Sequence, residues 1–520
     1  MIRCIAIPCC IAVWLAASPA AAATFSVTNT ANSGIGSLRQ AVLDANAAPG
    51  ADVVTFAIPG SGPHVIALQT SALDSVGPLM IDGLSQAGAI ANSQTPEQGG
   101  LNGLLKVMLV PTASSSAPSA IRIAAGEVTL RGLVISGFGN SAGVSVAGTS
   151  TVASIEGCIF GTDASGNAAY APAGQRGLFV SQGRVRVGGQ TPMQRNLFAG
   201  HSNDAIQLHT ASASGSIVEG NLFGTSANGI AAIGNGSGGG GYALHVRAAS
   251  TATLQDLRVG GTATASRNVF AAGFNSAIRI ACTFAVQAGC VDGLLIQGNY
   301  IGTDANGVHA LPNGSGCPIG GCSGAAASGI DVSGLTLGLV VVGGSAPGAG
   351  NLIVFNRGGG IGWDVTAGTV IGSLEILGNS LAYNTGSGIR LRRASTSMPN
   401  DPNDVDEGPN RFQNTPVIES AVLSSSGTEL EITYRIDTAV ANADYPLRAD
   451  FYRSSDGEEG DDYLGSDEYP AAAAQTSRTV VMPLPPGGGL PLVATATDAQ
   501  GHTSQFSLGD LIFRDDFELE

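Results

Sequence analysis

The chain has 520 residues, of which 75 are glycine, 44% are hydrophobic and only 12% are charged. The glycines show no three-residue period and the apolar content is enough for a core, which excludes collagen and a disordered polymer. The 39 acidic and 23 basic residues give a net charge of -16 with no basic tract, so we do not expect nucleic acid as a partner.

Residues 1–23 predict a secretory signal peptide. Arg3 precedes an apolar run through Trp14, and three alanines ending at Ala23 offer a cleavage site. The run is short for a membrane anchor, which is the alternative, and no later segment is apolar for long enough to span a bilayer. We therefore expect a monomer that is secreted or held at the outer cell surface, with no membrane span after cleavage.

Residues 24–127 are expected to hold an N-terminal cap and the first coils of a repeat. The segment from Ser37 to Gln40 has the pattern of a capping box, which predicts the start of a short helix. The apolar positions that would share one face of that helix are Leu38, Ala41, Val42 and Ala45. Such a helix would cover the exposed edge of the first coil.

Residues 128–400 contain tandem repeats of short strands separated by glycine and asparagine. One motif reads Ile-x-Gly-Asn, a second reads Val-Gly-Gly with a later asparagine, and each is followed by a third of the form Ile-x-Val. A single coil of this kind cannot bury its apolar side, but stacked coils can. The pattern predicts an all-β fold, a right-handed parallel β-helix. The first motif starts at Ile155, Val218, Ile296 and Ile376, and the second has Gly188, Gly260 and Gly343 as its first glycine.

The same segments resemble bacterial secreted right-handed β-helix proteins of the CSLREA type. The resemblance rests on Val27-Thr-Asn-Thr30, Gly36-Ser-Leu-Arg-Gln-Ala41, the repeats, and Asn400-Asp-Pro-Asn-Asp404 through Gln413-Asn-Thr-Pro416. Gly36 stands where that motif has cysteine. The resemblance implies the fold along nearly the whole mature chain, and it implies no single reaction.

One asparagine recurs at the same point of successive repeats. Stacked side-chain amides can bond to one another and to the neighbouring backbone, so we expect a structural ladder at a bend of the coil. Cys158 occupies the same position in one repeat. The members of the expected ladder are Asn196, Asn221, Asn268, Asn299, Asn351 and Asn379.

The middle residue of the third motif is expected to point outward, because its apolar neighbours point inward. In coil order these residues are Ser145, Phe179, Gln207, His245, Arg279, Asp331, Gly362 and Arg390. Neighbouring strands lie about 4.8 Å apart, so four of them would form a polar stripe that binds a glycan: Gln207, His245, Arg279 and Asp331. A solvated face with no ligand is the alternative interpretation.

A catalytic hypothesis uses the same stripe. Asp364 lies one coil beyond Asp331 and two residues further along, about 8 Å away, which suits the carboxylate pair of an inverting glycosidase. Arg279 and His245 would assist. The motifs of polygalacturonases, pectate lyases and epimerases are missing, so the sequence favours binding over catalysis, with a polysaccharide hydrolase or lyase as the alternative.

Residues 401–414 form an acidic linker that could hold calcium, although no cofactor is required. Its oxygen ligands would come from Asp401, Asn403, Asp404 and Asp406. Export makes disulfides plausible, and the pairs that lie close together in the sequence are Cys282 with Cys290 and Cys317 with Cys322.

Residues 415–508 read as strands with polar turns and predict a small β-sandwich, whose end resembles the closing strands of Ig-like domains. Residues 509–520 form a C-terminal tail that resembles the ending of some bacterial secreted proteins. The expected function is binding of polysaccharide or of another cell-surface glycan. The alternatives are the enzyme described above and a structural stalk that displays the sandwich.

Overall fold

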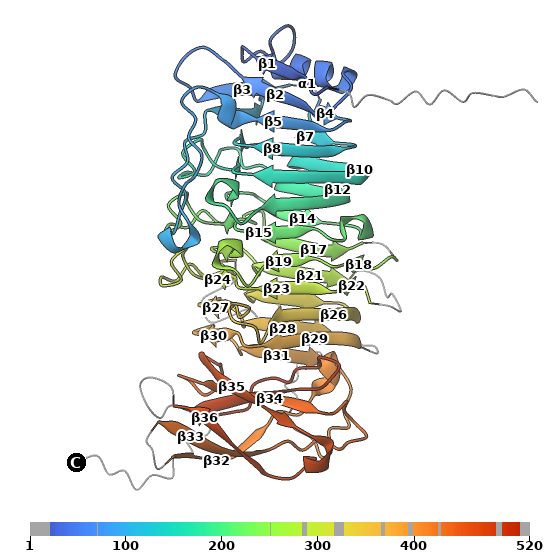
Figure 1. The fold of residues 1–520 in the computed structure, drawn as a ribbon, viewed down its shortest axis with the longest axis vertical. Helices are drawn as coiled ribbons and strands as arrows, with labels where there is room; N and C mark the ends of the chain where they lie inside the picture. Colours follow the sequence, from blue (N-terminus) through green and yellow to red (C-terminus); the bar gives the residue numbers. More distant parts are fainter. Residues whose placement is uncertain are drawn as a thin grey trace, which may run out of the picture.

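The structure, a computed structural model, describes residues 21–69, 71–249, 251–282, 289–316, 327–365, 370–393, 399–424, 428–484 and 491–509. The chain climbs through a tall stack of short strands, with helix α1 at one end and a sandwich of antiparallel strands at the other (Figure 1). The signal peptide prediction falls mainly on residues 1–20, outside the described part. The predicted fold class, a right-handed parallel β-helix with a capping helix and a sandwich, is confirmed.

Each coil of the helix has three faces, and the strands of each face pair in parallel with the next coil. Face 1 contains β1 (Thr24–Val27), β2 (Asp52–Phe56), β5 (Leu79–Asp82), β8 (Glu127–Arg131), β15 (Ile217–Glu219), β19 (Arg258–Gly260), β23 (Leu294–Gln297), β26 (Thr336–Gly343) and β29 (Ile371–Leu377). Face 2 contains β4 (Leu73–Ser75), β7 (Ser119–Ile123), β14 (Ile206–Leu208), β17 (Leu244–Ala248), β21 (Ile278–Cys282), β25 (Ile330–Ser333), β28 (Ile361–Val365) and β31 (Ile389–Arg393).

Two long strands, β10 (Ala142–Glu156) and β12 (Arg176–Gly188), run through both faces and join them into one 19-stranded sheet. Face 3 is a separate 10-stranded sheet made of β3 (His64–Leu68), β6 (Val107–Pro111), β9 (Val134–Ile135), β11 (Ile159–Phe160), β13 (Leu197–Phe198), β16 (Leu222–Phe223), β20 (Val269–Phe270), β24 (Tyr300–Ile301), β27 (Leu352–Val354) and β30 (Ser380–Ala382). A further short pair, β18 (Leu254–Gln255) and β22 (Val291–Asp292), lies outside the three faces.

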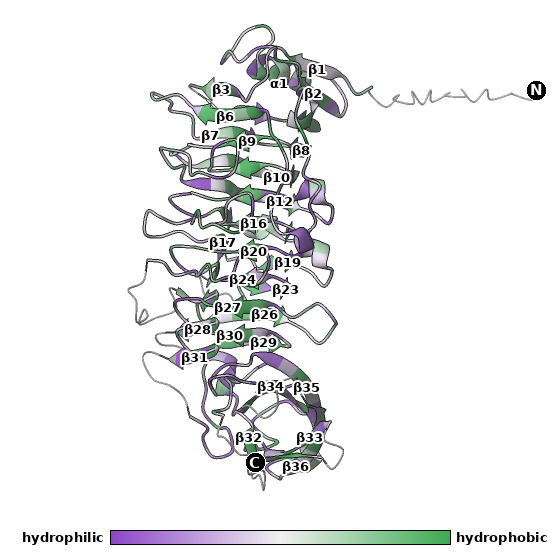
Figure 2. Ribbon diagram, turned by 90° about the vertical axis from the view of Figure 1, so that its left-hand side faces the viewer, coloured by the Kyte–Doolittle hydropathy of each residue, from purple (hydrophilic) through white to green (hydrophobic). Residues whose placement is uncertain are grey.

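The core runs without interruption along the axis of the stack. Alternate residues of each strand point inward, and their side chains form one continuous apolar cluster from Val27 to Leu391. Figure 2 shows the hydrophobic residues concentrated along the stacked strands. Four phenylalanines of face 3 add a column of stacked rings with centroids 4.5–5.3 Å apart: Phe160, Phe198, Phe223 and Phe270. Stacking of equivalent rings adds favourable contacts between neighbouring coils.

Helix α1 (Leu38–Ala47) closes the N-terminal end, and the four residues predicted to share its apolar face are all buried. Ser37 caps the helix by accepting a hydrogen bond from the backbone N–H of Gln40 at 3.2 Å. The predicted reciprocal half of the capping box is wrong, because the Gln40 side chain donates to Asp44 instead. Within the described ranges, none of the helices has the length and apolar character that a bilayer crossing needs.

The predicted asparagine ladder is confirmed from end to end. Each Nδ2 donates to the Oδ1 of the asparagine in the next coil at 2.8–3.0 Å, from Asn196 through to Asn379. Cys158 holds the first position, where its backbone N–H donates to Asn196 Oδ1 at 2.8 Å. The ladder supplies a partner to amides that would otherwise be buried without one at the bend between face 1 and face 3.

A second ladder, which the sequence analysis missed, runs along the bend between face 3 and face 2. Asn313 donates to Asn356 and Asn356 donates to Asn384, both at 2.9 Å. Asn384 then donates to Glu459 of the sandwich from its backbone N–H and from its side chain, at 2.9 and 2.8 Å. One step of this ladder therefore joins the β-helix to the sandwich.

The sandwich packs two three-stranded antiparallel sheets around its own core. One sheet contains β32 (Val417–Leu423), β33 (Glu429–Arg435) and β36 (Arg478–Pro483), and the other contains β34 (Leu447–Arg453), β35 (Asp462–Tyr469) and β37 (Leu492–Thr497). Residues 401–414 connect it to the last coil.

The sandwich closes the C-terminal end of the helix. Backbone N–H groups of the last coil donate to the connecting segment and to the sandwich, with Leu374 bonded to Asn410 Oδ1 at 2.8 Å and Ile376 bonded to Thr503 Oγ1 at 2.9 Å. Tyr452 and Phe506 join the apolar core of the β-helix. The open edge of the last coil is thus covered, as α1 covers the first.

Candidate functional site

The outward column of face 2 has the register that the sequence predicts. Cross-strand pairing places Phe179, Gln207, His245, Arg279 and Asp331 opposite one another in successive coils. The column continues through Gly362 and Arg390 toward the C-terminal end, and through Ser145 toward the N-terminal end. The sequence predicts this register because the motif occurs once in each coil and its apolar residues alternate with period two.

The side chains of the column are less accessible than an exposed stripe would be. Gln207 is 3% exposed and Asp331 is 0% exposed. Two loop residues that the sequence analysis missed, Asp204 and Tyr242, contact His245 of this column. The predicted four-residue stripe from Gln207 to Asp331 is therefore wrong as an open surface at its two ends, because both of these side chains are buried.

His245 lies at the centre of a polar network. Its Nδ1 is 3.2 Å from Asp204 Oδ2 and 3.4 Å from Gln207 Nε2. Arg176 Nε is 3.6 Å from the same Asp204 oxygen. The Asp204 carboxylate is 2% exposed and lies within reach of both the His245 ring and the Arg176 guanidinium.

The two carboxylates of the catalytic hypothesis each pair with a different arginine. Asp331 is bound by Arg279, whose second nitrogen donates to Ser333 Oγ at 2.7 Å. Asp364 pairs with Arg390 at 3.2 Å. Burial lowers the pKa of Arg279. Because Asp331 has no accessible surface, it cannot meet a polymer in this structure, and the pair does not form an open catalytic cleft.

Aromatic and basic side chains gather around the polar network, and we call this group the aromatic–arginine patch. It consists of Arg176, Phe179, His209, Tyr242, His245 and Arg279, all partly exposed. Ring centroids lie 5.5 Å apart for Phe179 and His209, and 5.1 Å apart for Tyr242 and His245. The guanidinium carbon of Arg176 lies 5.5 Å from the Phe179 centroid, and that of Arg279 lies 5.8 Å from Tyr242.

The patch extends over four successive strands of face 2 and combines flat apolar surfaces with fixed hydrogen-bond donors. Burial and the charges of Arg247, His245 and Arg176 lower the pKa of His209, so this ring is neutral near pH 7. Rings with polar groups at their edges are the usual lining of a small-molecule site.

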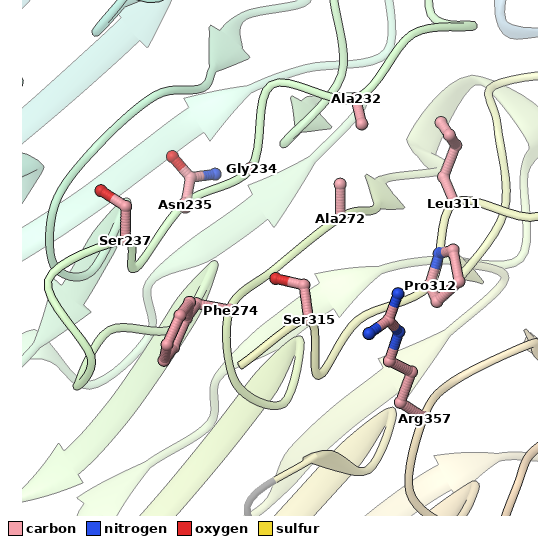
Figure 3. A pocket seen from close by; sticks show the side chains of 10 residues that line it. All are labelled: Ala232, Gly234, Asn235, Ser237, Ala272, Phe274, Leu311, Pro312, Ser315 and Arg357. Carbon is pink, nitrogen blue, oxygen red and sulfur yellow. The ribbon is translucent and has the colours of Figure 1, made fainter. Parts of the chain in front are cut away.

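A pocket lies nearby among the loops that join face 3 to face 2. Its volume is about 380 Å³, and its lining includes Phe274, Leu311, Ser315 and Arg357 (Figure 3). Figure 3 shows the Arg357 side chain extending among the lining residues, beside Ser315 and Pro312. The sequence analysis missed this pocket.

The acidic linker brings three of its four predicted calcium ligands together. One carboxylate oxygen each from Asp401, Asp404 and Asp406 lies within 4.8 Å of the others. Burial, with a smaller contribution from neighbouring carboxylates, raises the pKa of Asp404 and of Asp406 to about 6. The fourth predicted ligand, Asn403, is exposed, and its side-chain oxygen accepts a hydrogen bond from Gln475. A calcium site built from the three aspartates stays a prediction.

The five cysteines that follow the predicted signal peptide fall into three groups. The predicted disulfide between Cys282 and Cys290 is confirmed, with a Cα–Cα distance of 5.7 Å. Cys317 and Cys322 lie outside the described residues. Cys158 is a free, buried thiol, and burial raises its pKa to about 12. A thiol that is neutral and enclosed in this way has a structural role.

Comparison with known proteins adds little to this geometry. No family model matches the chain, and no curated protein matches it. Among solved structures, the crystal structure of the Dettilon tailspike protein is similar over 86% of this chain and 90% of that chain, with 11% sequence identity and a TM-score of 0.20. A likeness at that level carries no argument, so the fold rests on the strand pairing and the function rests on the site.

Proposed function

We propose that this protein is exported and binds polysaccharide along face 2 of the β-helix without cleaving it. The observation that carries the proposal is the aromatic–arginine patch, in which two partly exposed rings, Phe179 and Tyr242, lie beside guanidinium groups on stacked strands. A repetitive polymer can place successive units on successive coils, because the strands repeat at a constant spacing of about 4.8 Å.

The contacts within the patch favour binding over catalysis. A general acid and base must reach the bond that is cleaved. Asp331 is buried, Asp364 pairs with Arg390, and Asp204 is occupied by His245 and Arg176. The polar groups near the patch hold one another in place, which preorganises a binding surface.

The test is a panel of polysaccharides with the purified mature protein, read by thermal shift and by release of reducing ends. We expect at least one polysaccharide to raise the unfolding temperature without new reducing ends. Phe179→Ala and Tyr242→Ala should each weaken that binding. Tyr383→Ala is the matched control, since Tyr383 is 63% exposed and lies outside the patch.

Product formation that is lost in Asp364→Asn would overturn the proposal in favour of a hydrolase. Absence of any thermal shift and of any product across the panel would also overturn it, and would leave the structural stalk.

A further inference from the structure

The pocket in Figure 3 is built by equivalent loops of four successive coils. Ser237 comes from the loop after β16, Phe274 from the loop after β20, Ser315 from the loop after β24 and Arg357 from the loop after β27. These loops are neighbours in space only because the coils stack. The pocket is thus a product of the repeat.

The second asparagine ladder holds the wall of this pocket in place. Asn313 directly follows Pro312, and Asn356 directly precedes Arg357. Both asparagines are 0% exposed and bonded to each other, and the Arg357 backbone N–H donates to the Asn313 carbonyl at 3.0 Å. On the opposite side, the Phe274 N–H donates to the Asn235 carbonyl at 2.8 Å. A pocket whose backbone is fixed in this way loses little entropy when it binds a ligand.

The lining has a definite chemical character. Phe274, Leu311 and Pro312 provide apolar surface, and Ser237 and Ser315 provide hydroxyl groups. Within the described part of the chain, Arg357 is the one ionisable residue of the lining. Among the lining residues that the structure describes there is no carboxylate, although acidic residues outnumber basic ones 39 to 23 in the chain. The volume of about 380 Å³ lies at the lower end of the range of about 300–1,000 Å³ for small-molecule sites, which suits one or two sugar rings.

We propose that this pocket is a subsite for a uronic acid unit, with Arg357 holding the sugar carboxylate and Phe274 packing against the apolar face of the ring. A guanidinium binds a planar carboxylate with two parallel hydrogen bonds, which a neutral sugar cannot offer. The hydroxyl groups of Ser237 and Ser315 can bond to ring hydroxyls. This inference rests on the proposed polysaccharide binding and names the class of polysaccharide.

The experiment measures binding of matched acidic and neutral probes to the full mature protein by isothermal titration calorimetry. The probes are oligogalacturonate, oligomannuronate and hyaluronan oligosaccharides, each beside its methyl-esterified form, in which the carboxylate is neutralised. Galactose oligomers that carry sulfate esters form a third arm. We expect one acidic probe to bind at least about tenfold more tightly than its ester, because a hydrogen bond to a charged group is worth about one to two decades of affinity.

Variants identify the pocket as the place where the carboxylate binds. Arg357→Gln should lose that preference for the acidic probe, Arg357→Lys should keep part of it, and Phe274→Ala should weaken both forms. Arg122→Gln is the charge-matched control, since Arg122 lies on β7, far along the stack, with a side chain 46% exposed. Thermal unfolding of each variant shows whether it is folded.

The outcomes separate the two proposals. Equal affinity for the acid and its ester, or an unchanged preference in Arg357→Gln, would overturn the uronic acid subsite. Binding of neutral polysaccharides alone, or a preference for sulfate esters, would also overturn the subsite and leave the proposed function standing. Failure of every glycan to bind would overturn both.

Discussion

Asn268 offers a direct test of what holds the coils in register. Its Oδ1 accepts from the backbone and the side chain of Asn221, both at 3.0 Å, and its Nδ2 donates to the Val218 carbonyl at 2.8 Å and to Asn299 at 2.9 Å. Asn268→Ala removes all four bonds. It leaves the Asn221 backbone N–H and the Val218 carbonyl without these partners in a fully buried site, while the Asn221 side chain keeps its bonds to the Val187 and Glu219 carbonyls.

The expected cost follows from those two groups. A buried polar group that loses its partner costs about 1–3 kcal/mol, so the substitution should destabilise the protein by about 2–6 kcal/mol.

The first position of the ladder allows the opposite change. Asn at position 158 would meet the Leu130 and Glu156 carbonyls that now lie 3.6 and 3.3 Å from the Cys158 sulfur, and Cys158→Asn should stabilise by about 1 kcal/mol.

The assay is urea unfolding followed by circular dichroism, with the midpoint as the measured quantity because stacked repeats need not unfold in one step. Asn268→Ala should lower the midpoint, Cys158→Asn should raise it, and Asn167→Ala, at an exposed turn, should leave it unchanged. If Asn268→Ala unfolds at the same urea concentration as the wild type, the reasoning about the ladder is refuted.

Three further predictions concern the C-terminal half. Burial raises the pKa of Glu459 to about 8, so the folded protein favours the neutral form of this side chain. The contribution of Glu459 to stability should therefore be greatest below its unfolded pKa of about 4.5, and should be lost as the pH rises to about 8. In Glu459→Gln the unfolding temperature should fall less between these pH values, while Glu458→Gln, at an exposed neighbouring residue, should behave like the wild type. An unchanged pH dependence in Glu459→Gln would disprove the raised pKa of Glu459. Calcium should raise the unfolding temperature of the wild type and not of Asp401→Asn, and an equal rise in both would place the ion elsewhere. Replacing Cys282 and Cys290 by serine should lower the free energy of unfolding by about 2 kcal/mol, the value expected for a disulfide that closes a short loop. Urea unfolding under oxidising conditions measures this loss, and an unchanged midpoint would show that the disulfide adds no stability.

The sequence predicts those parts of the molecule that every coil repeats. One motif per coil and strict alternation along the strands were enough to place Asn268 in the ladder and Arg279 opposite Asp331. The buried face of α1 followed from helical spacing in the same way. Periodicity works here because each coil repeats the packing of its neighbour.

The loops between the faces follow no such rule, and the site depends on them. The second ladder is visible where the coils are regular, since Asn356 and Asn384 each lie five residues after an asparagine of the first ladder. In the preceding coil an inserted turn, closed by a bridge between Thr303 and Ala310, pushes Asn313 further along and hides the pattern. The lining of the pocket likewise comes from loops of unequal length, for which no spacing rule exists.

Binding of an acidic polysaccharide without cleavage is the central claim, and one titration tests it most directly. Mature protein is titrated with the tightest acidic oligosaccharide while reducing ends are measured in the same sample. The account predicts saturable binding that weakens in Tyr242→Ala and Arg357→Gln, with no increase in reducing ends. New reducing ends, or binding that neither substitution changes, would contradict it.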